Sequence, residues 1–157
     1  MRQINFIQKL VTEEKIKLVE ASKEVSKSYA QKSNNSFKAA RILLAQSLLE
    51  ESTSMAYYAM FHKVIALFRL IGIKCENHAA TIILLKELFG IENKEISFAK
   101  QERVDKQYYT EFKITKNDVE DMITKTEEFI EELDLFTDKL REDKVKYFKE
   151  SFKKTYF

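Results

Sequence analysis

The chain has 157 residues, of which 45% are hydrophobic and 33% charged, so it can build one packed core beneath a well-hydrated surface. It contains 2 Gly and no Pro, which excludes folds that depend on tight turns or glycine-rich loops, such as sandwiches, Rossmann folds and P-loops. With 27 Lys and Arg against 25 Asp and Glu, the net charge of +2 gives no global electrostatic reason to bind nucleic acid or a membrane.

The first third of the chain predicts two helices. Residues 4–31 are rich in Lys and Glu with sparse apolar positions, which is typical of a solvated N-terminal helix that adds little to the core. The run of Ser and Asn at 33–36 predicts a kink or a cap. From Phe37 onward, apolar residues recur at three- and four-residue steps, which predicts a helix that ends near Glu51.

The next two helices have clear signals at their ends. Ser52–Ser54 offers N-terminal caps for a helix from Met55 to Ile71, and Gly72 suits the left-handed conformation after its last turn. Because this segment is apolar on nearly every face, we expect it to be the buried central helix. Asn77 can cap a third helix, which Gly90 closes.

Two further helices complete the expected bundle. The fourth spans about 95–112 and should place four residues toward the core: Phe98, Val104, Tyr108 and Phe112. Thr115–Asp118 resembles a capping box and opens the longest helix, whose apolar stripe loses phase near Asp143. The pattern predicts an all-α antiparallel bundle with four core helices, an N-terminal helix and a long C-terminal helix. We divide residues 1–157 into a core bundle (36–140), the N-terminal helix (1–35) and a basic, aromatic extension (141–157).

The C-terminal extension carries its own apolar stripe among five lysines: Val145, Phe148, Phe152 and Tyr156. We expect a protruding element. Two interpretations stay open: a core-packing last turn whose lysines face water, or an arm that forms a dimer or binds a partner through Val145, Phe148 and Phe152. An RNA-contacting patch is a lesser alternative, because three acidic residues of this segment dilute the positive charge that phosphate binding requires.

Several classes of site and compartment are excluded or disfavoured. Cys75 is the only cysteine, so no internal disulfide forms, and no group of Cys and His has zinc-ligand spacing. Neither His62 nor His78 follows a Glu by three positions, as di-iron bundles require, and the motifs of common hydrolases, NTPases and metalloproteases are missing. Residues 1–10 lack an uninterrupted apolar stretch long enough for a signal peptide, so we expect none, and the most apolar stretch, 55–73, carries charged residues. We expect a cytoplasmic protein without metal, cofactor or membrane segment.

The most specific segment is Ser54–Phe68, which reads Ser-Met-Ala-Tyr-Tyr-Ala-Met-Phe-His-Lys-Val-Ile-Ala-Leu-Phe. It resembles the signature helix of the HEPN superfamily, whose members often read Ala-Tyr-Tyr-Ala-Met-Phe-His at this point. The Ala-x-x-Leu-Leu pattern within Phe37–Glu50 is similar to the family's first core helix. Arg103–Tyr109 is similar to an Arg-containing stretch that ends in Asp-Tyr or Tyr-Tyr. The resemblance covers about 37–133.

The resemblance implies a bundle that dimerises across a cleft. In catalytic members this cleft holds an Arg-x4-6-His motif that cleaves RNA without metal, in which the His assists attack by the 2′-hydroxyl and the Arg stabilises the phosphate. No arginine of this chain is followed by a His at that spacing. Arg103 is followed instead by Tyr108, a phenol whose ordinary pKa of about 10 makes it a poor general base. We therefore expect no robust ribonuclease activity, with Arg103, Tyr108 and His62 as weak catalytic candidates.

Ligand binding does not need the missing histidine. Five residues are expected to line a binding pocket if the second and fourth core helices pack together: Tyr58, His62, Arg69, Arg103 and Tyr109. Each also has a structural interpretation. A buried His62 can be satisfied by a helical carbonyl, and Arg69 by an ion pair with an acidic residue of a neighbouring helix. Tyr57 and Tyr58 are core aromatics whose hydroxyls need one partner each.

Three functions follow as hypotheses. The first is a non-catalytic or weakly catalytic HEPN-like homodimer that binds RNA, a nucleotide or a protein, beside a small nucleotidyltransferase in a toxin–antitoxin or defence setting. The second is a metal-independent ribonuclease in which His62 or His78 of one subunit meets Arg103 of the other. The third is a helical scaffold whose last helix and aromatic, lysine-rich tail bind another protein. The observation that best separates them is whether a symmetric cleft brings Arg103 and His62 together.

Overall fold

The computed structural model describes residues 1–108 and 113–157, with side chains described for 1–103 and 113–157. Within these ranges the chain forms seven helices and two short strands: α1 (Arg2–Thr12), β1 (Ile16–Leu18), α2 (Lys23–Ala45), α3 (Leu49–Ile71), β2 (Ile73–Cys75), α4 (His78–Phe89), α5 (Lys94–Tyr108), α6 (Lys116–Asp138) and α7 (Glu142–Tyr156). The two strands form one small antiparallel pair, in which Ile16 faces Cys75 and Leu18 faces Ile73. The fold is all-α, as the sequence predicts.

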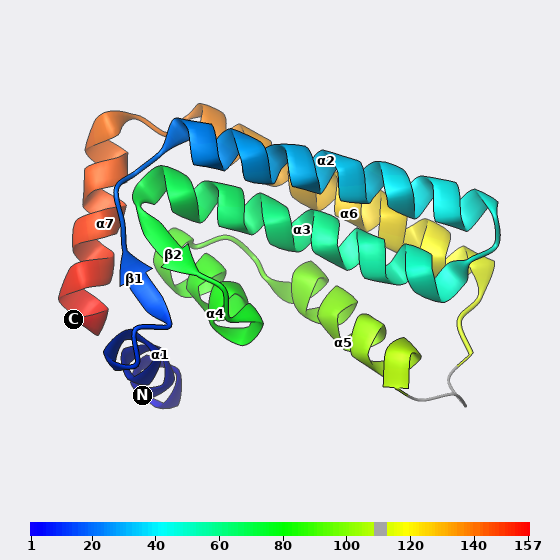
Figure 1. Cartoon of the computed structure of the whole chain (residues 1–157), viewed down its shortest axis with the longest axis horizontal. Helices are drawn as coiled ribbons and strands as arrows, with labels where there is room; N and C mark the ends of the chain where they lie inside the picture. The colour runs from blue at the N-terminus through cyan, green and yellow to red at the C-terminus, as the bar shows by residue number, and fades with distance from the viewer. Residues whose placement is uncertain (109–112) are drawn as a thin grey trace.

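The bundle is built around α3. In Figure 1, α2 and α3 lie side by side and run in opposite directions, with α6 behind them and α5 along the lower side. More than half of the 23 residues of α3 are buried, which confirms the prediction that it is the central helix. At one end of the bundle α7 crosses the other helices, and α1 lies beside it, so the two termini are close together (Figure 1).

The predicted end signals of three helices are confirmed. Gly72 and Gly90 follow α3 and α4 in the left-handed conformation, with φ of 94° and 69°. The Asn77 side chain accepts a hydrogen bond from the Ala80 amide at 3.0 Å and caps α4. The capping box of α6 is present at Thr115–Asp118, with each side chain bonded to the backbone of the other residue.

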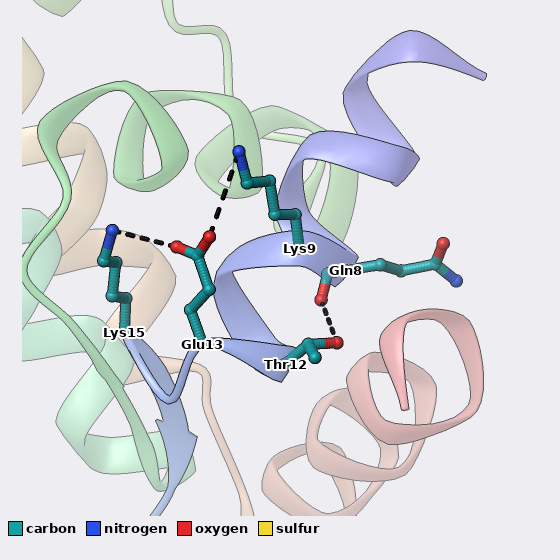
Figure 2. A network of polar contacts seen from close by, with 5 residues as sticks. All are labelled: Gln8, Lys9, Thr12, Glu13 and Lys15. Carbon is teal, nitrogen blue, oxygen red and sulfur yellow. Dashed lines mark hydrogen bonds and ion pairs between the residues drawn. The ribbon is translucent and has the colours of Figure 1, made fainter.

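The predicted N-terminal helix over residues 4–31 is wrong, because a turn at 13–15, β1 and the irregular residues 19–22 interrupt it. Its first part ends at Thr12, and Glu14 then adopts a positive φ of 57° that turns the chain. Figure 2 shows the polar contacts around this turn, in which the Glu13 carboxylate lies 2.9 Å from the Lys15 ammonium. The hydrogen bond with Lys15 lowers the pKa of Glu13. After β1, Ser22 caps α2 by accepting from the Val25 amide.

Serines that were expected at helix boundaries instead lie within helices and form hydrogen bonds between α2 and α3. Ser33 lies within α2 and donates to the Ala59 carbonyl of α3 at 2.7 Å, so residues 33–36 form neither a kink nor a cap. Ser52 lies within α3, which begins at Leu49, and donates to the Ala40 carbonyl at 2.7 Å. A third such bond runs from Ser26 to Ala66 at 2.8 Å. These buried bonds fix the register of the α2–α3 pair.

The C-terminal extension packs against the core, so the expected protruding element is wrong. Phe152 is fully buried in its own chain, and Val145 and Phe148 are half-buried against the core cluster. The alternative interpretation of a core-packing segment is confirmed. Phe152 is therefore not free to contact a second subunit, which removes it from the predicted interface. Whether the protein dimerises by another surface stays a prediction.

Two other predicted core positions differ from the structure. Phe98 of α5, which was expected to face the core, is 53% exposed, and Tyr147 of α7, which continues the three- and four-residue apolar spacing of the predicted long helix, is 59% exposed. The other predicted core positions of the fourth helix lie among the residues whose side chains are not described: Val104, Tyr108 and Phe112. In the described part of the chain, no helix is long and apolar enough to cross a membrane.

Candidate functional site

Tyr57 and His78 form the centre of a polar cluster within the core. Tyr57 projects from α3, and its hydroxyl lies 2.6 Å from Nδ1 of His78, the first residue of α4. Burial raises the pKa of Tyr57 far above its ordinary value, so the hydroxyl keeps its proton and can donate to Nδ1. In that tautomer the neutral imidazole carries its proton on Nε2, away from Tyr57.

His78 is held in place from a second direction by Phe61. The two rings are stacked, with centroids 4.1 Å apart and an interplanar angle of 4°. Burial lowers the pKa of His78, and the charges of Arg103, Lys100 and His62 lower it further. The imidazole is therefore neutral at pH 7, which is the form that can accept a proton.

Arg103 of α5 reaches the same cluster. Its guanidinium carbon lies 5.2 Å from the centre of the Tyr57 ring and 5.4 Å from that of Tyr58, within the range of a cation–π contact. Nη1 donates to the Tyr58 hydroxyl at 3.3 Å, whereas the buried Nε has no hydrogen-bond partner among the described residues. A half-buried arginine with an unused donor is suited to an anionic group.

His62 lies next to this arrangement, one turn after Tyr58 on α3. Its ring stacks on Tyr58 with centroids 6.0 Å apart and lies 6.2 Å from Tyr29 of α2. Burial and the nearby charge of Lys32 lower its pKa. Its buried Nδ1 has no hydrogen-bond partner, so the expected bond to a helical carbonyl is not formed at that atom.

Three of the five predicted pocket residues are thus brought together: Tyr58, His62 and Arg103. Arg69 does not join them, because it lies eleven residues after Tyr58, about 16 Å along the axis of α3. Its buried Nε has no hydrogen-bond partner, so no ion pair through that atom satisfies it. Tyr109 lies outside the described residues, as does the side chain of Tyr108.

The sequence interpretation omitted two members of the cluster, Tyr57 and His78, from its binding residues. The need of each tyrosine hydroxyl for one partner was the available signal, and the structure supplies His78 for Tyr57 and Arg103 for Tyr58. Arg103 and a histidine therefore lie in one cluster within a single chain. Among the described residues, no group of three or more His, Cys, Asp and Glu could hold a metal ion.

A family model for the HEPN domain matches residues 26–136. The chain belongs to the HEPN domain family. The match runs from the first turn of α2 to the last turn of α6, so it contains the whole cluster and leaves α1, β1 and α7 outside. No curated protein matches the sequence. In this HEPN domain the arginine of the cluster comes from α5, as the resemblance implies, but its two imidazoles come from α3 and α4 rather than from a position shortly after the arginine.

Proposed function

We propose that this HEPN domain binds RNA or a nucleotide through a phosphate contact made by Arg103. The observation that carries the proposal is the placement of this guanidinium across the rings of Tyr57 and Tyr58 with its buried Nε unpaired. A phosphate at Nε would complete the hydrogen bonds of the guanidinium and add a charge-assisted contact.

The test is a fluorescence-polarisation titration of single-stranded RNA at several salt concentrations. Arg103→Ala should weaken binding about tenfold or more, because a hydrogen bond to a charged group contributes about 1.5–3 kcal/mol. It should also reduce the slope of log affinity against log salt by about one, which marks a lost phosphate contact rather than a general loss of fold. Exposed Arg141 provides the matched control, and Arg141→Ala should bind within about twofold of wild type. Equal affinities and slopes for wild type and Arg103→Ala would refute the proposal.

A second candidate, metal-independent RNA cleavage, is favoured by one observation: His78 and Arg103 contact the same Tyr57 ring. The sequence led to the hypothesis of a histidine from one subunit acting with Arg103 of the other, whereas His78 and Arg103 lie in one cluster of a single chain. In its other tautomer His78 donates Nδ1–H to the Tyr57 oxygen, and the free Nε2 could then take the proton of the attacking 2′-hydroxyl while Arg103 stabilises the phosphate. General-base assistance of this kind typically contributes about 10²–10⁴-fold.

Incubation of varied RNAs with excess chelator separates the two candidates. Cleavage by wild type that is lost in both His78→Gln and Arg103→Ala, but retained in His62→Gln, would establish the nuclease. We expect RNA to remain intact with wild type, because the low pKa of His78 makes it a weak base. Three further proposals rest on the family resemblance: a homodimer, a small nucleotidyltransferase partner, and a toxin–antitoxin or defence setting. Sedimentation at tens of micromolar tests the homodimer, and co-purification tests the nucleotidyltransferase partner.

A further inference from the structure

A separate pocket lies beside the C-terminal half of α3, which follows Tyr58 along the helix. Its volume is about 810 Å³, within the size range of sites that bind small molecules. The walls come from the first turns of α2, the last turns of α3 and the junction of α6 with α7, in the upper left of Figure 1. We call it the lysine pocket, after the five lysines that line it: Lys23, Lys27, Lys63, Lys146 and Lys149.

The charge around this pocket is strongly one-sided. Glu142 is the only acidic residue among those that line it, so the lysines leave a positive excess. Two of them are already engaged: Lys63 pairs with Asp134, and Lys149 donates to the Val19 carbonyl at 3.0 Å. The other three come from α2 and α7. Because α2 and α7 begin at this pocket whereas α3 and α6 end there, the helix dipoles offset one another, and the positive excess comes from the lysine side chains.

The floor of the lysine pocket is aliphatic. It is formed by alanine, leucine, isoleucine and valine side chains that include Ala30, Ala66 and Leu70, and no aromatic side chain is among the residues that line it. A nucleobase would therefore find no ring on which to stack. An alkyl chain would cover aliphatic surface that is otherwise open, and each Å² removed from water contributes about 25 cal/mol.

We propose that the lysine pocket binds a small molecule with an anionic head on a single alkyl chain. The chain lies on the aliphatic floor between α2 and α3, and the head, a carboxylate or a phosphate, lies at the rim near Lys27 and Lys146. The proposal does not rest on the function of Arg103, because the lining of the lysine pocket shares no residue with the cluster around Tyr57.

Isothermal titration calorimetry with four probes tests the proposal. Decanoate and decyl phosphate, used below their micelle concentrations, should bind, and their relative affinities distinguish a carboxylate head from a phosphate head. Decanol, which lacks the charge, should bind at least about tenfold more weakly, and adenosine monophosphate should not compete with decanoate. Absence of binding by both anions, equal binding of decanol, or competition by the nucleotide would each overturn it.

Variants locate the binding in the pocket. The charge-reversed double variant Lys27→Glu, Lys146→Glu should weaken decanoate binding about tenfold or more, and Ala30→Phe should block the alkyl chain of every probe. The matched control, Lys38→Glu with Lys144→Glu, reverses one exposed lysine on each of the same helices outside the pocket and should bind within about twofold of wild type. Circular dichroism of each variant confirms that it is folded. Equal weakening by both double variants, or binding of an acidic amphipathic peptide in place of decanoate, would refute the assignment.

Discussion

Replacing Phe152 by alanine tests whether α7 is part of the core. The ring is fully buried, with its centre 5.2 Å from the Tyr156 ring, and α7 contacts α1, α3 and α4. Removing a buried phenyl ring loses its transfer free energy and leaves a cavity, which together cost about 3–5 kcal/mol. That is a large share of the roughly 5–15 kcal/mol that stabilises a typical domain. Urea unfolding followed by circular dichroism should show the free energy of unfolding fall by this amount, as a lower midpoint at an unchanged slope.

Tyr147→Ala is the control on the same helix. This ring is 59% exposed, so its removal should change the free energy of unfolding by less than about 0.5 kcal/mol. Equally small effects of the two substitutions would show that α7 leaves the bundle in solution, and the reasoning from burial would fail. Loss of a dimer by Phe152→Ala, with stability unchanged, would restore the interpretation of residues 141–157 as a partner-binding arm.

Two more predictions concern backbone and pH. In thermal unfolding, Gly72→Ala should destabilise the protein by more than the ~1–2 kcal/mol that a left-handed conformation costs, because its Cβ would lie 2.5 Å from the Val19 carbonyl oxygen. Gly90→Ala should cost only that amount, because a Cβ there would meet nothing within 4 Å. Burial lowers the pKa of His62 and His78 in the folded state, so the unfolded chain takes up protons first as the pH falls below about 6.5, and stability should fall. His78→Gln should flatten this dependence between about pH 7 and pH 5, and a wild type that gains stability over that range would contradict the prediction.

Helix ends were predictable where the signal and its effect are adjacent. Asn77 caps a helix that begins at the next residue, and Gly72 takes the left-handed conformation directly after α3. The break in the N-terminal helix has no such local signal, because β1 forms by pairing Ile16 with Cys75, a residue far along the chain. Local helical propensity is overridden there by a non-local pairing, which a single sequence does not reveal.

The candidate site was predicted in part for a similar reason. Tyr58 and Arg103 were found because they lie in segments that resemble the family's signature, and they do meet at 3.3 Å. His78 contributes through a hydrogen bond to Tyr57, twenty-one residues earlier, and nothing in its own segment marks it. Arg69 was included because it shares a face of α3 with Tyr58, but a shared face fixes direction and not distance along the axis.

The cluster around Tyr57 is better arranged for binding an anion than for moving a proton. The Tyr57 hydroxyl holds its proton because burial raises its pKa, so it fixes the orientation of His78 and is not itself a base. The positive charge of Arg103 that would attract a phosphate also lowers the pKa of His78. A base works best when its pKa lies near the working pH, so the free protein has an imidazole that is neutral but weak. A bound phosphate would offset the charge of Arg103 and raise the pKa of His78 toward its ordinary value. Binding therefore comes first in this arrangement, and any proton transfer by His78 depends on the anion already being in place.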